Sequence, residues 1–159
     1  SIVASFGYAR RLYEFVQALF ITSILSVVYP KFSSLVVSDK IERFVDSMIQ
    51  TMNVIIIVLV PIVIGCGVLA KPIVEVLFQR NAFTAEDTII TANILIIYVT
   101  GVLAFALRDV MSRGFYSLED SKTPMTNGVI AIIFNVGLNL LFIKPLGYKG
   151  LALATSISA

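Results

Sequence analysis

The chain has 159 residues, of which 58% are hydrophobic and 14% are charged, and its mean hydropathy is +0.94. Soluble domains carry about 45–50% apolar and about 25% charged residues, so this composition excludes an ordinary soluble domain. A net charge of +2 is too small to indicate a nucleic-acid partner. The chain has no histidine and a single cysteine, Cys66, which argues against an enzyme, a disulfide and a metal centre.

Five apolar runs separated by short polar connections predict an all-α, polytopic transmembrane helical bundle, with four full spans and the start of a fifth. The first residue is not methionine and the last run is unfinished, so we interpret the chain as a partial transmembrane transporter domain, a fragment of a larger protein. The expected spans are at about residues 1–37, 47–69, 88–110, 124–143 and 150–159, the last one truncated.

The first run carries Arg10, Arg11 and Glu14 beside an uncharged, mainly apolar stretch, Phe15–Tyr29. That stretch is shorter than the roughly 20 residues that cross a bilayer, so the span has to include the charges. An arginine at the centre of a bilayer costs roughly 2.5–3.5 kcal/mol, and Glu14 can neutralise only one of the two across one helical turn. We therefore expect the remaining cation to face a watery cavity and to bind an anionic ligand.

The face that carries these charges continues through small or mildly polar residues, namely Ala4, Gly7, Ala18 and Thr22. Such residues suit a cavity wall or close helix packing, and they do not suit lipid contact. We expect one long helix here, with a break near Glu14.

The connections between the runs carry local signals. Thr84, followed by Asp87 three residues later, predicts a capping box before the third span. Pro124 predicts the first position of the fourth helix. We also expect a charged surface loop at Ser38–Asp46 and a tight turn at Lys144–Gly147.

The distribution of basic residues predicts the orientation. Six of them follow the first and third spans, and four follow the second and fourth, which places the first group in the cytoplasm. The first group is Lys31, Lys40, Arg43, Arg108, Arg113 and Lys122, and the second is Lys71, Arg80, Lys144 and Lys149. The charges at Arg108–Arg113 are interpreted as a solvated or headgroup-facing helix end.

Several spaced motifs resemble the MurJ/MviN family of bacterial lipid II flippases, within the multidrug/oligosaccharidyl-lipid/polysaccharide exporter superfamily. They are Tyr8-Ala9-Arg10-Arg11-Leu12, Leu77-Phe78-Gln79-Arg80 up to Phe83-Thr84, Phe115-Tyr116-Ser117 with Lys122-Thr123-Pro124, and Pro145-Leu146-Gly147 leading to Gly150-Leu151-Ala152. The resemblance covers essentially the whole chain. It implies the front part of the second half of a transporter of about fourteen spans.

The resemblance implies that the protein flips a peptidoglycan precursor, an undecaprenyl-diphosphate-linked glycopeptide lipid, across the bacterial cytoplasmic (inner) membrane by alternating access. The implied partners are this lipid, membrane lipids and the remainder of the same transporter. The arginine of the family's Tyr-Ala-x-Arg-Leu pattern, a cavity residue, falls on Arg11. Arg10 occupies the x position, where other members often have an acidic or amide residue, and we expect it to pair with Glu14.

Some members of the family are thought to bind sodium between the fourth span, the next span and an earlier helix. Asn135, Asn139 and Thr155 fall at the matching positions, and no other cofactor is implied. However, a carboxylate is expected at one of these places, whereas both residues of the fourth span are neutral amides. Interhelical hydrogen bonding is therefore the default interpretation.

Two alternatives stay open. One is an exporter of another lipid-linked oligosaccharide or of a drug from the same superfamily. A drug exporter would favour a net-negative cavity, which the surplus positive charge around Arg11 opposes. The other is a non-transporting structural membrane domain in which Arg10, Arg11 and Glu14 lock two helices together. A structural ion pair should tolerate joint replacement by apolar residues, whereas a substrate site should not.

Overall fold

The computed structural model describes residues 2–79 and 83–158, and every regular element among these residues is helical. The elements are α1 (Ile2–Val16), the π-helical turn η1 (Gln17–Thr22), α2 (Ser23–Val37), α3 (Ile41–Val68), α4 (Ala70–Phe78), α5 (Ala85–Ser117), α6 (Lys122–Leu146) and α7 (Tyr148–Ile157). Four continuous stretches of the described chain are long and apolar enough to cross a membrane: Ala4–Val37, Ile41–Val68, Ala85–Ser117 and Lys122–Leu146. The predicted all-α transmembrane fold is confirmed.

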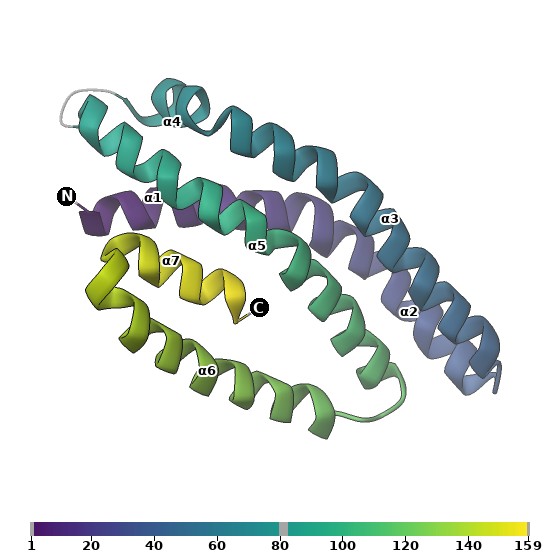
Figure 1. Cartoon of the computed structure of the whole chain (residues 1–159). Coiled ribbons are helices and arrows are strands. Elements are labelled where there is room, and N and C mark those ends of the chain that lie inside the picture. The colour runs from purple at the N-terminus through teal and green to yellow at the C-terminus, as the bar shows by residue number, and fades with distance from the viewer. Residues whose placement is uncertain (1, 80–82, 159) are drawn as a thin grey trace.

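Helix α5 lies at the centre of the arrangement and touches α1, α2, α3, α4 and α7 (Figure 1). Its buried residues recur every three or four positions along most of its length, which is the period of one helix face. They include Thr88, Ala92, Leu95, Val99, Val102, Ala106 and Val110. Helix α6 is the opposite case, because it packs mainly on α7 and none of its residues is buried.

Two hydrophobic cores lie along α5. The first joins α5 to α2 and α3, and in it the buried rings of Phe32 and Phe44 meet edge to face at 5.5 Å. The second joins α5 to α1, α4 and α7 through smaller side chains such as Ala9 and Ala152. Small side chains let helix backbones approach closely. At Gly101 the approach is so close that a Cβ atom would lie 2.9 Å from Ser156 Oγ.

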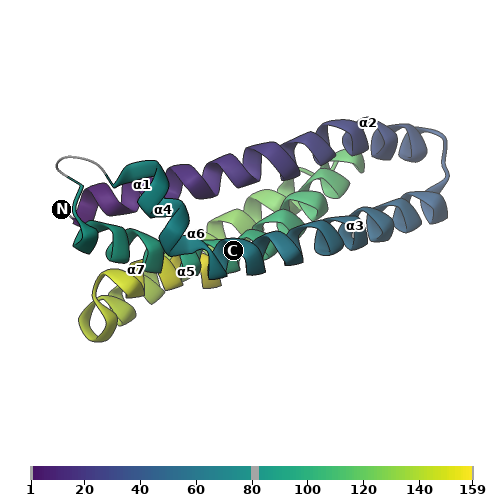
Figure 2. The same cartoon turned by 90° about the horizontal axis from the view of Figure 1, so that it is seen from above.

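The ends of the helices fall into two groups (Figures 1 and 2). The α2–α3 and α5–α6 connections lie at one end of the bundle, while the start of α1 and the α6–α7 turn lie at the other. This alternation is the one expected for successive membrane crossings. Which end faces the cytoplasm stays a prediction from the basic residues.

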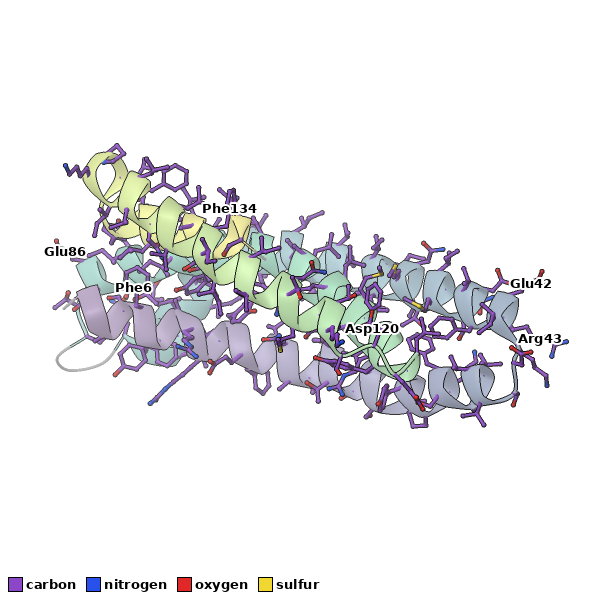
Figure 3. The ribbon with its side chains drawn as sticks, turned by 90° about the horizontal axis from the view of Figure 1, so that it is seen from below. Phe6, Glu42, Arg43, Glu86, Asp120 and Phe134 are labelled. Carbon is purple, nitrogen blue, oxygen red and sulfur yellow. The ribbon has the colours of Figure 1, made fainter. Side chains whose placement is uncertain are left out.

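The predicted loop at Ser38–Asp46 is wrong in its extent, because α3 begins at Ile41. Asp39 takes a positive φ of 54°, and this left-handed residue reverses the chain within a very short connection. The charged residues beyond it therefore lie on the first turns of α3. Figure 3 shows Glu42 and Arg43 at the end of the bundle, pointing away from it.

The capping box at the start of α5 is confirmed: Thr84 Oγ1 accepts a hydrogen bond from the Asp87 amide, and the Thr84 amide donates to the Asp87 carboxylate. The prediction for α6 is wrong by one half-turn, since the helix begins at Lys122 and Pro124 is its third residue. The carboxylate of Asp120 accepts hydrogen bonds from the amides of Lys122 and Thr123 at 3.0 and 3.1 Å, which fixes the earlier start. Proline is tolerated in this first turn because its missing N–H has no helical partner there.

The predicted turn at Lys144–Gly147 is also wrong in its bounds. Helix α6 continues through Pro145 to Leu146, and the chain reverses at Gly147, whose φ of 54° suits a residue without a side chain. Helix α7 then starts at Tyr148, two residues earlier than the expected start at Gly150. Gly150 is instead the point where α7 lies closest to α6, because a Cβ atom there would collide with the Phe142 carbonyl.

Candidate functional site

The three charged residues of α1 are Arg10, Arg11 and Glu14, and they lie three to seven residues before the π-helical turn. Arg10 Nε donates to Glu14 Oε1 at 2.7 Å, so the expected ion pair forms across one helical turn. The two side chains are 72% and 50% exposed. An exposed pair of this kind contributes at most about 1 kcal/mol. It neutralises Arg10 without holding α1 against another helix.

Arg11 is exposed, and within residues 2–79 and 83–158 no carboxylate lies within ion-pair distance of its guanidinium. One positive charge on this apolar helix is therefore uncompensated by the described part of the chain. Because the residue is exposed, its five N–H donors can reach an acceptor outside the described chain. This arrangement fits the predicted substrate role of Arg11, which stays a prediction.

The depth of Arg11 in a membrane follows from its distance to the apolar run. Phe15–Tyr29 has Thr22 at its middle, and Arg11 lies eleven residues earlier. At about 1.5 Å per residue this is ~16 Å, close to half of the ~30 Å hydrocarbon thickness. With the run centred in the bilayer, Arg11 lies near one hydrocarbon boundary, where a long side chain can reach phosphate groups.

We define the open face of the first span as Ala4, Gly7, Arg11, Ala18 and Thr22. All five residues are exposed. A Cβ atom at Gly7 would meet nothing within 4 Å, so the glycine does not serve a close contact inside the described chain. Of the two interpretations of this face, close helix packing is not observed within the described residues. The open face is available to a cavity or to the rest of a larger protein.

The second predicted site is a hydrogen-bonded network between α6 and α7. Asn139 Nδ2 donates to Asn135 Oδ1 at 2.9 Å, and Asn135 Nδ2 donates to Ser158 Oγ at 2.9 Å. Thr155 lies nearby but its hydroxyl donates to the Leu151 carbonyl, one turn back on its own helix. The structure thus joins the two asparagines to Ser158. The sequence did not predict the role of Ser158, because its hydrogen bond to Asn135 connects segments that are distant in the chain.

This network fits a sodium ion poorly. Asn135 Oδ1 already accepts a hydrogen bond, and Asn139 Oδ1 is the one buried amide oxygen in the described chain without a partner. A hard cation needs several oxygen ligands, and within the described residues no cluster of three metal-binding side chains of the Asp, Glu, His or Cys type occurs. In the described residues the network forms interhelical hydrogen bonds, whereas sodium binding by Asn135, Asn139 and Thr155 stays a prediction, through which we derive no transport step.

An open cavity of about 670 Å³ lies between α5, α6 and the end of α7. Its polar lining comes from Arg108, Asp109, Ser112, Arg113, Asn127, Asn135, Thr155 and Ser158. The guanidinium of Arg113 lies 5.4 Å from the centre of the Tyr29 ring, and that of Arg108 lies 5.0 Å from the Phe105 ring. These stacked arginines hold α5 side chains in place beside the cavity.

The sequence contained a signal for this cavity. Asn127, Gly128, Ala131, Ile132 and Asn135 all line it, and their spacing places them on one face of α6. The other half of the cavity needs the α5–α7 contact, which the sequence does not show. Arg11 is not among the lining residues, so the open face of the first span and this cavity are separate features.

The chain is similar to known proteins over nearly its whole length. The family model described as "Lipid II flippase MurJ" matches residues 1–159. The probable lipid II flippase MurJ of Vibrio cholerae serotype O1 is 39% identical over 152 residues, which are 96% of this chain and 29% of that protein. The corresponding protein of Haemophilus influenzae is 36% identical over 158 residues, with 96% of this chain and 31% of that protein covered.

A relative from Thermosipho africanus, named lipid II flippase MurJ, is 30% identical over 151 residues, covering 95% of this chain and 31% of that protein. A solved structure titled "Lipid II flippase MurJ, inward closed conformation" matches with a TM-score of 0.86 and 30% identity, over 99% of this chain and 33% of that one. The chain thus spans about three tenths of the length of the curated relatives it matches. It belongs to the lipid II flippase MurJ family.

Proposed function

We propose that the protein containing this chain flips lipid II, a polyprenyl-diphosphate-linked peptidoglycan precursor, across the bacterial inner membrane. Family membership over all 159 residues supports the proposal. The observation that carries it is the state of Arg11: an exposed guanidinium without a carboxylate partner among the described residues, on an apolar membrane helix. The surplus positive charge favours an anionic cargo over a cationic drug.

The physical difficulty of such a step is the diphosphate. Moving its negative charges and a bulky polar headgroup through hydrocarbon is strongly unfavourable unless the protein replaces the lost water. A guanidinium presents a planar fork of donors that matches phosphate oxygens, and it keeps its charge at membrane depth. Arg11 on the open face supplies one such group, while Arg10 is already bound to Glu14.

The proposed mechanism is alternating access. The open face of the first span lines a central cavity shared with the remainder of the transporter, and two helical bundles rock about that cavity. The α5-centred packing moves as one bundle because α5 touches α1, α2, α3, α4 and α7. No covalent bond is made or broken, so we propose a transporter and not an enzyme. Its partners are the glycopeptide lipid and the surrounding membrane lipids.

The structural alternative, in which the charged trio locks two helices together, has less support. The Arg10–Glu14 bond lies within one helix, and both side chains are largely exposed. An ion pair that joined two helices would connect different elements and would be less exposed. The same geometry therefore favours a role for the unpaired Arg11 outside the folding of this chain.

The proposal is tested with the purified full-length protein in lipid vesicles that contain fluorescently labelled lipid II in both leaflets. A membrane-impermeant quencher is added outside, and the quenched fraction is measured. We expect about half of the signal to be quenched in protein-free vesicles, and nearly all of it when the protein flips lipid II during the assay. An unchanged fraction for lipid II, with movement of a different labelled oligosaccharide lipid or of a cationic drug, would reassign the cargo.

A further inference from the structure

The first membrane span contains one irregularity, the π-helical turn η1 at Gln17–Thr22, between the regular helices α1 and α2. A π-helical turn closes its hydrogen bonds from residue i to i+5, so it holds one residue more than an α-helical turn. In an α-helix each residue advances the face by about 100°. One extra residue therefore rotates everything before it by about 100° relative to everything after it.

The residues that pack inward show the effect of this turn. We define the packed stripe of the first span as its buried positions: Ser5, Ala9, Ile21, Leu25 and Phe32. Ser5 to Ala9 and Ile21 to Leu25 are steps of four residues and Leu25 to Phe32 is a step of seven, so each fits whole turns of an α-helix. Ala9 to Ile21 is a step of twelve residues, one more than the roughly eleven that three α-helical turns hold. That step crosses η1.

Both halves of the packed stripe meet the same partner. Ala9 belongs to the same hydrophobic core as Ala92, Leu95 and Val99 of α5, and Leu25 belongs to the core that contains Val102 and Ala106, further along the same helix. Helix α5 is regular over its whole length from Ala85 to Ser117. A regular partner requires that α1 and α2 present one continuous face, and the π-helical turn is what aligns them.

An uninterrupted α-helix would place other residues against α5. Stepping back from Ile21 by the regular intervals of four and three residues reaches Gln17, Glu14 and Arg10. The ion pair would then face the second hydrophobic core, where burying two charges carries a large desolvation penalty. In the structure Ala9 is 0% exposed in that place, and Arg10 and Glu14 lie outside.

We infer that the π-helical turn Gln17–Thr22 sets the rotational register of the arginine-bearing half of the span, so that Ser5 and Ala9 face α5 while Arg11 lies on the open face. The turn is a positioning element, because it acts on the cargo only through the direction in which α1 presents Arg11. Its transport consequence rests on the proposed function, whereas the register itself does not.

The test changes the length of the turn by one residue in each direction, in the full-length protein. Deletion of Ala18, an exposed small residue, removes the extra residue and lets the segment continue as a plain α-helix with both faces unchanged. Insertion of one alanine between Ala18 and Leu19 is the matched control. It lies at the same site and adds a further rotation of about 100°.

The register is read by cysteine labelling in a cysteine-free background, with Cys66 replaced by alanine. Ala9→Cys reports the packed stripe and Gly7→Cys the open face, each treated with a water-soluble maleimide and normalised to labelling after denaturation. We expect Ala9→Cys to be protected and Gly7→Cys to be labelled in the parent and in the deletion variant. The insertion variant should lose the protection of Ala9→Cys or fail to accumulate.

Transport of lipid II is the second readout. The deletion variant should stay within about twofold of the parent, and the insertion variant should lose about 100-fold because Arg11 is misplaced. The inference is overturned if the deletion variant fails to accumulate, changes the labelling pattern or loses transport, or if the insertion variant behaves like the parent. Absence of transport in the parent would count against the proposed function instead, with the labelling result still deciding the register.

Discussion

The packed stripe and the open face of the first span are two sides of one helix with different surroundings. Ala9, Ile21 and Phe32 on the packed stripe are at most 1% exposed, whereas Ala4, Gly7 and Arg11 on the open face are all exposed. The stripe finds its partner, α5, inside this chain. The open face has none among the described residues. One side therefore holds the segment together, and the other is left for cargo or for the rest of the transporter.

The largest stability effect is expected from Phe32→Ala on the packed stripe. Phe32 is fully buried and packs edge to face on Phe44. Removing the ring leaves a cavity between α2, α3 and α5, which costs about 3–5 kcal/mol. The unfolding temperature of the purified full-length protein in detergent should fall clearly. A value within error of the parent would show that this core does not hold the helices together.

A smaller effect should separate the two faces directly. Ala9→Leu adds volume to a fully buried position and should cost about 1–3 kcal/mol by overpacking. Ala4→Leu adds the same volume to the open face and should leave the unfolding temperature of the protein nearly unchanged. Equal shifts of the unfolding temperature in Ala9→Leu and Ala4→Leu would contradict the distinction between the packed stripe and the open face.

The ion pair should contribute little to stability. Glu14→Gln removes the charge that accepts the hydrogen bond from Arg10 but keeps the size of the side chain. Because both groups are largely exposed, the loss should be below about 1 kcal/mol. Unfolding measured in low and in high salt checks this. A large, salt-independent loss would mean that the pair is buried in the full-length protein.

The smallest effect is a pH dependence at the α5–α6 connection. The pKa of Asp120 is lowered by the hydrogen bond from the Thr123 hydroxyl and by the amides of Thr123 and Lys122. A lowered pKa in the folded state means that the carboxylate stabilises the start of α6 above the ordinary aspartate pKa. This contribution is lost as the pH falls through the lowered value.

Hydrogen exchange of the Lys122 and Thr123 amides, corrected for intrinsic rates, measures this loss between about pH 5 and about pH 2. Protection should decrease towards the acidic end in the parent. In Asp120→Asn the acceptor oxygen remains but does not titrate, so protection should not vary with pH. Equal pH dependence in both proteins would exclude Asp120 as its origin.

The sequence was sufficient for features that depend on local spacing. The apolar runs, the Thr84–Asp87 capping box and the Arg10–Glu14 pair all follow from residues within one helical turn or one run, and the structure contains each of them. Hydropathy was less informative about helix ends, because it marks where apolar side chains lie and not where backbone hydrogen bonds stop. The start of α6 and the reversal at Gly147 depend on those bonds.

Features formed between distant segments could not be predicted from the sequence. The bond from Asn135 to Ser158 and the cavity beside Arg108 and Arg113 need the packing of α5, α6 and α7. The step of twelve residues from Ala9 to Ile21 is visible in the sequence only after the inward-facing residues are known. A break was expected near Glu14, and the π-helical turn begins three residues later, in a form that keeps the helix continuous.

The most direct test of the central claim is complementation of a flippase-depleted bacterium by the full-length protein with Arg11→Ala, Arg11→Lys or Arg10→Ala. Membrane levels are checked by immunoblot. Arg10→Ala is the matched control, because it removes a neighbouring charge that is already bound to Glu14. Our account predicts that Arg11→Ala accumulates normally but does not sustain growth, that Arg11→Lys rescues in part, and that Arg10→Ala supports growth. Growth of the Arg11→Ala strain at the parental rate would contradict the substrate role of Arg11.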